Sequence, residues 1–120
     1  MTDSILELTK KNVNVSIDDD SFDLDIITAI NTTFFTLNQL GIGPEQPFEI
    51  AGKQELWADF FGSDPKMNSV KSYMHLSVRL LFDPPATSFG LTAMEKQVDQ
   101  LGWRLNIARE TNQQTSLSSG

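Results

Sequence analysis

Residues 64–89 read DPKMNSVKSYMHLSVRLLFDPPATSF, and this stretch decides the fold class. Asp64 is a favoured helix N-cap, and Pro65 is favoured at the first helical position. Residues three or four positions apart then trace one helix face: Val70, Tyr73, Met74, Ser77, Val78 and Leu81. Pro84 and Pro85 end the helix, because a residue before proline avoids the helical region. The stretch therefore predicts a long amphipathic helix that ends just before the prolines.

Helical patterns also occur on both sides of this stretch. Residues 2–11 read as a short helix that Thr2, Asp3 or Ser4 caps, and a longer helix runs from Asp20 or Ser21 to residue 40. Gly41 follows it, in the position where left-handed glycine usually ends a helix. A last helix begins near residue 87 or 88. Its apolar residues repeat at the spacing of helices that pack nearly antiparallel: Leu91, Met94, Val98, Leu101 and Leu105.

The patterns together predict a mostly α fold, a small helical bundle of about four to five helices with an irregular, aromatic-containing central loop. We expect one helical domain over residues 1–107 and a flexible C-terminal tail over residues 108–120, because the tail is polar. Four aromatic residues have two interpretations, core filling or an exposed anchor for another chain: Trp57, Phe60, Phe61 and Trp103. For the three in the central loop we favour the core.

Charge is distributed unevenly along the chain. The net charge is -7, and residues 12–52 contain seven acidic residues and no Lys or Arg. Binding of nucleic acid through a basic face is therefore not expected, since such a face needs clustered Lys and Arg. No apolar run approaches the roughly 18 residues of a membrane span, and no membrane partner is expected.

Motifs of catalysis, cofactor binding and metal binding are missing from the sequence, which contains no cysteine. The acidic run that begins at Asp18 fails the EF-hand pattern, since the sixth residue is Asp23 instead of glycine. His75 is the only histidine, and Lys71 and Arg79 lie one turn away on either side. These cations lower the pKa of His75 and do not prepare it as a base. We therefore predict no enzyme, no cofactor and no catalytic or metal-binding residue.

The separated charges suggest an assembly surface. Aspartates open one helix, and a basic stripe follows another helix. If the two meet within one subunit they stabilise the fold, whereas between copies they form a head-to-tail contact that can close into a ring. The stiff corner after the second helix fixes an angle between helices, and we expect an ion pair in it between Asp83 and Arg79. The candidate interface comprises Asp18, Asp19, Asp20, Asp23, Asp25, Lys71, His75, Arg79, Asp83, Pro84 and Pro85.

Four segments occur in a characteristic order: TLNQLGIGP (36–44), WADFFG (57–62), VKSYMHLSVRLLFDPP (70–85) and MEKQVDQLGWRLN (94–106). With them the chain resembles the head-tail connector, or adaptor, proteins of tailed phages and prophages over roughly residues 1–107. The parts RLLFDPP and WRLN are the most specific. They are helix and helix-stop residues, so the resemblance concerns the fold more than any chemistry.

The resemblance implies a non-enzymatic structural protein that forms a homo-oligomeric ring. The ring would dock on the portal protein and bind the stopper or tail-completion protein, and DNA would pass through its channel without specific binding. It would assemble in the cytoplasm of the bacterial host and stay at the head-tail junction of the virion. The alternative is a small acidic prophage-encoded protein that binds and regulates a host protein.

Overall fold

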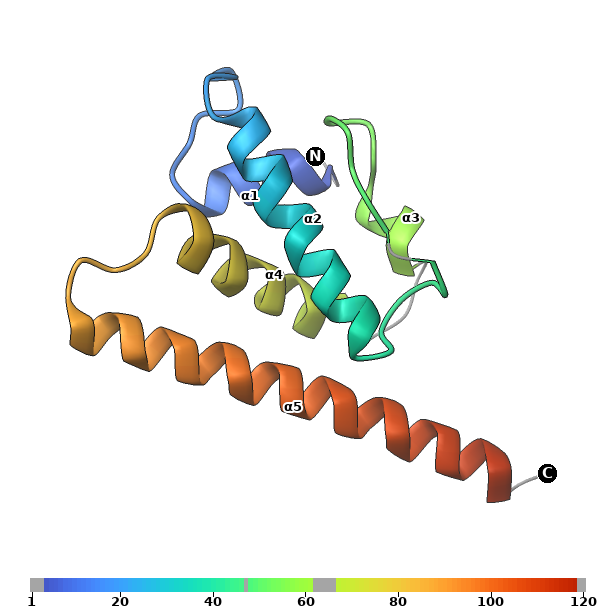
Figure 1. Ribbon diagram of the computed structural model, residues 1–120. Helices are drawn as coiled ribbons and strands as arrows, with labels where there is room; N and C mark the ends of the chain where they lie inside the picture. The colour runs from blue at the N-terminus through green and yellow to red at the C-terminus, as the bar shows by residue number, and fades with distance from the viewer. Residues whose placement is uncertain (1–3, 47, 62–66, 119–120) are drawn as a thin grey trace.

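Helix α4 (Met67–Phe82) lies at the centre of the fold. Helix α2 (Asp23–Gln39) crosses one side of α4, and the long α5 (Ser88–Ser118) runs along the other side (Figure 1). Helix α1 (Ile5–Asn12) packs against α2 and α4, and the short α3 (Trp57–Phe61) belongs to the connection between α2 and α4. The expected mostly helical bundle of four to five helices is confirmed.

The structure is a computed structural model that describes the backbone of residues 4–46, 48–61 and 67–118. The side chains of residues 61, 67 and 107–118 lie outside the description. The helix start predicted at Asp64 and Pro65 also falls outside the described residues.

Most of the described helix ends follow the local sequence signals. The Glu7 backbone N–H donates to Ser4 Oγ at 3.3 Å, so Ser4 caps α1 as one of the three expected candidates. Gly41 follows α2 with a φ of +80°, which only glycine adopts without strain. The Gly90 backbone N–H donates to Thr87 Oγ1 at 3.0 Å, so Thr87 caps α5, which begins at Ser88 as expected.

The predicted start of α2 is wrong. Neither Asp20 nor Ser21 caps the helix; Phe22 occupies the N-cap position and makes no side-chain cap hydrogen bond. Instead, the Ser21 backbone N–H donates to Asp19 Oδ1 at 3.0 Å in a local turn before the helix. The ring of Phe22 packs edge-on against Phe82 of α4, with 5.7 Å between the ring centroids. A tertiary contact therefore decides where the helix begins.

An aromatic cluster fills the core between α2 and the loop that contains α3. Phe34 of α2 lies 4.8 Å from Phe60 and 5.9 Å from Trp57 between ring centroids, and Phe48 lies 5.1 Å from Phe34. Aromatic pairs at such distances contribute about 0.5–1.5 kcal/mol beyond the burial of their area. The core interpretation is thus confirmed for Trp57 and Phe60, which are buried, while the side chain of Phe61 lies outside the described residues.

Gly102 allows α5 to approach α4 closely. A Cβ atom at this position would lie 3.2 Å from Cε2 of Tyr73 and 3.7 Å from Cδ1 of Leu40. One turn later, Asn106 Nδ2 donates to the Leu40 carbonyl at 3.3 Å and joins α5 to the end of α2. Helical backbone continues past residue 107 to Ser118, beyond the helix end expected from sequence, and the flexibility of residues 108–120 in solution stays a prediction.

Candidate assembly interface

The aspartate run surrounds the start of α2, and α1 holds it in place. Asp23 Oδ1 lies 2.7 Å from Nζ of Lys10, whose side chain is only 3% exposed. Lys10 also donates to the Ile17 carbonyl at 3.1 Å, which fixes the connection between α1 and α2. The hydrogen bond from the Ser21 backbone to Asp19 lowers the pKa of Asp19 below its ordinary value. Asp23 and Asp19 therefore have structural roles within the subunit.

The other three aspartates of the run, Asp18, Asp20 and Asp25, are exposed. Asp18 and Asp20 border a hollow of about 660 Å³ beside Lys10 and Asp23. Among the residues that the structure describes, no group of three or more His, Asp or Glu side chains is placed to hold a metal ion. Asp18 and Asp20 form an acidic surface at the connection between α1 and α2, whereas Asp25 lies on α2 beside Phe82 of α4.

The basic stripe lies on α4, and its members contact α1 and α3. Asn12 Nδ2 and His75 Nε2 lie 2.6 Å apart in a hydrogen bond that joins α1 to α4. Partial burial, and secondarily the charge of Lys71, lowers the pKa of His75. Lys71 Nζ lies 5.9 Å from the centroid of the Trp57 ring, a cation–π contact. Arg79 is exposed, so it is the member of the stripe that remains accessible to a partner.

The acidic run is joined to α1 by an ion pair. Among the described side chains, Asp23 of the run pairs with Lys10 of α1. Both versions of the charge hypothesis, a contact of the run with the stripe within one subunit and a contact between copies, stay predictions.

The corner between α4 and α5 begins with a backbone hydrogen bond, and several of its side chains are exposed. The Asp83 backbone N–H donates to the Arg79 carbonyl at 2.8 Å and ends α4 before Pro84. Its carboxylate makes no ion pair with the Arg79 side chain among the described residues, so this expected pair is wrong. Phe89 does not pack against the turn, since 86% of its surface is exposed.

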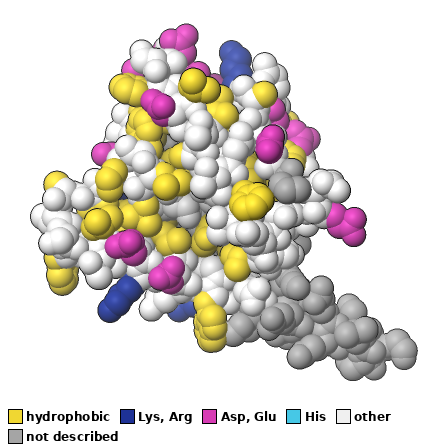
Figure 2. Space-filling model, in the orientation of Figure 1, with side chains coloured by type: hydrophobic (Ala, Val, Ile, Leu, Met, Phe, Trp, Pro, Cys, Tyr) yellow, Lys and Arg dark blue, Asp and Glu magenta, His cyan; other side chains and the backbone are white. Residues whose placement is uncertain are grey.

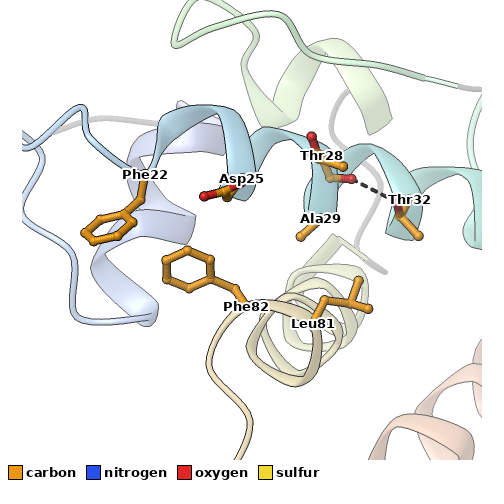
Figure 3. Close-up of a pocket in the computed structure, with 7 residues that line it drawn as sticks. All are labelled: Phe22, Asp25, Thr28, Ala29, Thr32, Leu81 and Phe82. Atoms are coloured by element: carbon orange, nitrogen blue, oxygen red, sulfur yellow. Dashed lines mark hydrogen bonds between the residues drawn. The ribbon is translucent and has the colours of Figure 1, made fainter.

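A groove lies between α2 and α4 that our predictions from the sequence did not include. We call it the α2–α4 groove. Its first part holds about 510 Å³ and is lined by Phe22, Asp25, Thr28, Ala29, Thr32, Leu81 and Phe82 (Figure 3). A second hollow of about 230 Å³ shares Thr32 and Leu81 with the first and extends the groove along α4 to Tyr73. In Figure 2, hydrophobic side chains gather on the left side of the molecule, where α2, α4 and the corner meet.

A signal for this groove was present in the sequence. Leu81 belongs to the predicted apolar face of α4, yet it is 57% exposed, because α2 and α5 do not cover the end of that face. Threonines recur at every fourth residue of α2, at 28, 32 and 36, beside its apolar positions. Thr28 and Thr32 are exposed and line the groove, so this spacing is the part of the sequence that pointed to it.

Trp103 lies outside the core, on the side of α5 that faces away from α4. Its side chain is 66% exposed, whereas its neighbours Gly102 and Leu105 are buried. The core interpretation is therefore wrong for this residue. The reason is its position on the helix. Gly102 and Leu105 lie on the face of α5 that packs inward, and Trp103 lies on the opposite face. The alternative interpretation, an exposed anchor, stays a prediction.

Comparison with known protein families identifies a relationship. The model of a protein family described as "Phage connector protein" matches residues 5–112. No curated protein and no solved structure matches the chain. The match begins at α1 and ends within α5, so it includes the first four helices of the described part and most of the fifth. Within that part no helix has the length and apolarity needed to cross a membrane.

Proposed function

The chain belongs to the phage connector protein family, a family of structural proteins, and from this premise we propose that it is the adaptor of the head-tail connector. In this role it docks on the portal and links the DNA-filled head to the stopper or tail. The observation that carries the proposal is the family match over residues 5–112. Assembly would take place in the cytoplasm of the bacterial host, and the protein would then stay at the head-tail junction.

Exposed apolar side chains support the proposal that the protein works by binding to other proteins. Leu24 is 76% exposed and Phe89 86% exposed. They lie on different helices, and Leu81 and Trp103 add two further exposed positions. Exposed apolar side chains mark protein-protein contacts where they gather into a contiguous patch, as at the corner and along the groove between α2 and α4. A connector that touches the portal, its own neighbours and the stopper needs several such contacts.

We infer that the copies assemble as a homo-oligomeric ring and that the separated charges help to orient neighbours. Exposed Asp18 and Asp20 on one copy can meet exposed Arg79 on the next, a head-to-tail contact of the kind that closes into a ring. Reversing the charges of Lys71 and Arg79 to Glu tests this contact. Lost assembly with retained stability supports it; unchanged assembly with lost stability would contradict it.

Acidic surfaces also suit a channel through which DNA passes. A wall that carries carboxylates does not bind phosphates, so DNA can slide past without specific contacts. The polar C-terminal residues 108–120 supply a second docking element, which would order when it meets the portal. Deleting residues 108–120 is expected to weaken portal binding, and undiminished binding would refute this role for the tail.

Electron microscopy of the full chain mixed with the portal ring of the same phage tests the proposal directly. The expected result is an added ring of density on the portal, with a mass that corresponds to several copies of the chain. The portal alone is the control. A portal that stays bare while the chain binds a host protein instead would overturn the adaptor role and favour a regulatory one.

A further inference from the structure

We propose that the outer face of α5 in one copy docks into the α2–α4 groove of a second copy, with Trp103 as the anchor. This inference rests on the proposed function, because it names the contact through which neighbouring subunits join. We call the inserted surface the α5 ridge and define it by Lys96, Gln100, Trp103 and Arg104, which are all exposed. The groove carries an exposed carboxylate and an apolar lining, and the ridge carries cations and an exposed tryptophan, so the two surfaces are complementary in chemistry.

The groove offers an apolar site that the subunit itself leaves uncovered. Leu81 and Phe22, which line it from α4 and from the start of α2, are 57% and 44% exposed. Figure 3 shows both side chains at the groove, Phe22 from the start of α2 and Leu81 from α4 below the threonines. The ring contact between Phe22 and Phe82 closes one end of the groove. An aromatic side chain of a partner would cover this apolar lining and exclude water from it.

The threonine wall of the groove can be covered without leaving buried hydroxyl donors unpaired. Thr28 Oγ1 donates to the Leu24 carbonyl at 2.9 Å, and Thr32 Oγ1 donates to the Thr28 carbonyl at 2.9 Å. Thr36 continues the same pattern toward Thr32 at 3.3 Å. A buried hydroxyl without a partner costs about 1–3 kcal/mol, and these internal bonds remove that cost. The wall therefore accepts an apolar neighbour.

The α5 ridge has the amino-acid composition that is typical of the centre of a protein-protein interface. Trp103 is 66% exposed, and Arg104 lies next to it on the exposed side of the helix. Trp and Arg are the residues most enriched where interfaces derive most of their binding free energy. Lys96, two turns earlier, adds a second positive charge near the same face. The ridge thus combines one large apolar anchor with two cations.

Charge complementarity identifies the occupant of the groove. Asp25 lines the groove and is exposed, and within the described part of the chain it forms no ion pair. Arg104 is likewise exposed and unpaired there. Trp103 in the groove would bring the adjacent Arg104 toward Asp25. A second copy of this acidic protein is otherwise repelled by like charge, so a contact between copies has to use its basic surface.

The placement of the two surfaces makes this contact one between copies. Helix α4 lies between α2 and α5, and the ridge faces away from α4, so one chain cannot fill its own groove with its own ridge (Figure 1). The groove and the ridge are also different surfaces. A contact between unlike surfaces leaves one of each free, and it repeats from copy to copy until a ring closes.

Cysteine cross-linking tests the contact, because the chain contains no cysteine of its own. Two single variants of the full chain, Thr32→Cys in the groove and Gln100→Cys on the ridge, are mixed and oxidised, alone and on the portal ring of the same phage. We expect a disulfide-linked dimer from the mixture and little from either variant by itself. Thr32→Cys mixed with Glu49→Cys, an exposed position outside both surfaces, is the matched control.

Substitutions measure how much single residues contribute to the affinity between copies. We expect Trp103→Ala to weaken self-association by about 30-fold, the equivalent of the roughly 2 kcal/mol that defines an interface hot spot. Phe35→Ala is the matched control, since it removes an aromatic group that is 53% exposed on α2 but does not line the groove. Asp25→Arg should weaken association, and the double variant Asp25→Arg with Arg104→Asp should restore it. Far-UV circular dichroism checks that each variant is folded.

The outcomes separate this inference from the proposed function. If rings form on the portal but Thr32→Cys and Gln100→Cys do not cross-link selectively, the ridge-groove contact is wrong and the adaptor role stands. Equal effects of Trp103→Ala and Phe35→Ala would also overturn the contact. If no ring forms on the portal, the adaptor role fails, and selective cross-linking of the chain alone then decides whether the contact exists.

Discussion

The buried ion pair between Lys10 and Asp23 predicts an asymmetric response to mutation. Lys10 is almost completely buried, with 3% of its side chain exposed, whereas Asp23 is 30% exposed. Removing the carboxylate leaves a buried ammonium group without its counterion. Removing the ammonium group leaves a carboxylate whose Oδ1 atom is buried but whose side chain as a whole is 30% exposed, so water is available close by. We therefore expect Asp23→Ala to destabilise the protein more than Lys10→Met.

The burial of the two side chains sets the magnitudes. Breaking a buried pair from one side costs about 3–5 kcal/mol, and the partial exposure of Asp23 places this pair at the low end, about 3 kcal/mol. Lys10 also keeps its hydrogen bond to the Ile17 carbonyl in the Asp23→Ala variant. Methionine at position 10 fills the space of the lysine stem, so Lys10→Met should cost about 1 kcal/mol or less.

Urea unfolding followed by far-UV circular dichroism measures both free energies of unfolding. Asp25→Ala is the matched control, because Asp25 is an exposed carboxylate in the same first turn of α2 and makes no ion pair in the described part of the chain. It reports the loss of about 0.3–1 kcal/mol of interaction with the helix dipole. Equal costs for Asp23→Ala and Asp25→Ala, or a larger cost for Lys10→Met than for Asp23→Ala, would refute the reasoning.

Three further perturbations follow from the structure. Because the folded protein lowers the pKa of His75, its contribution to stability is complete above the ordinary histidine pKa of about 6.5 and decreases as the pH falls toward the folded value. Urea unfolding at several pH values should show this decrease, and His75→Gln should flatten it; an unchanged slope would contradict the assignment. Thr87→Ala should cost about 1 kcal/mol in thermal unfolding, since Gly90 loses its cap hydrogen bond, whereas Thr87→Ser should cost less. Phe34→Ala should cost about 3–5 kcal/mol because it empties the centre of the aromatic cluster, and a loss below about 1 kcal/mol would show that the core rearranges to fill the space.

Much of the fold follows from signals that act within one helix. Gly41 adopts the left-handed conformation after α2, and Thr87 caps α5, as their sequence neighbourhoods predict. Both signals depend on a backbone requirement a few residues away, so they can be identified without knowledge of the partners. The apolar periodicity of residues 70–81 likewise predicted the central helix, and Val70, Met74 and Val78 are completely buried.

Side chains whose environment depends on distant segments could not be predicted in this way. Trp103 is as apolar as Trp57, yet Trp57 is buried beneath α2 and α4 while Trp103 faces outward on α5. Composition cannot separate the two, because the rotation of α5 is fixed by the close approach of Gly102 to Tyr73. The groove depends in the same way on how far α2 and α5 extend over the end of α4.

The sequence by itself determined the helical class, most of the helix ends and the uneven distribution of charge. These properties are local, since they depend on spacing, on caps and on the count of ionisable groups. Tertiary structure alone decided that Asp23 pairs with Lys10, that Phe22 replaces the expected cap of α2, and that Trp103 remains exposed. Each of these outcomes needs two segments to meet in space, and the free energy of that contact exceeds the weaker local preference.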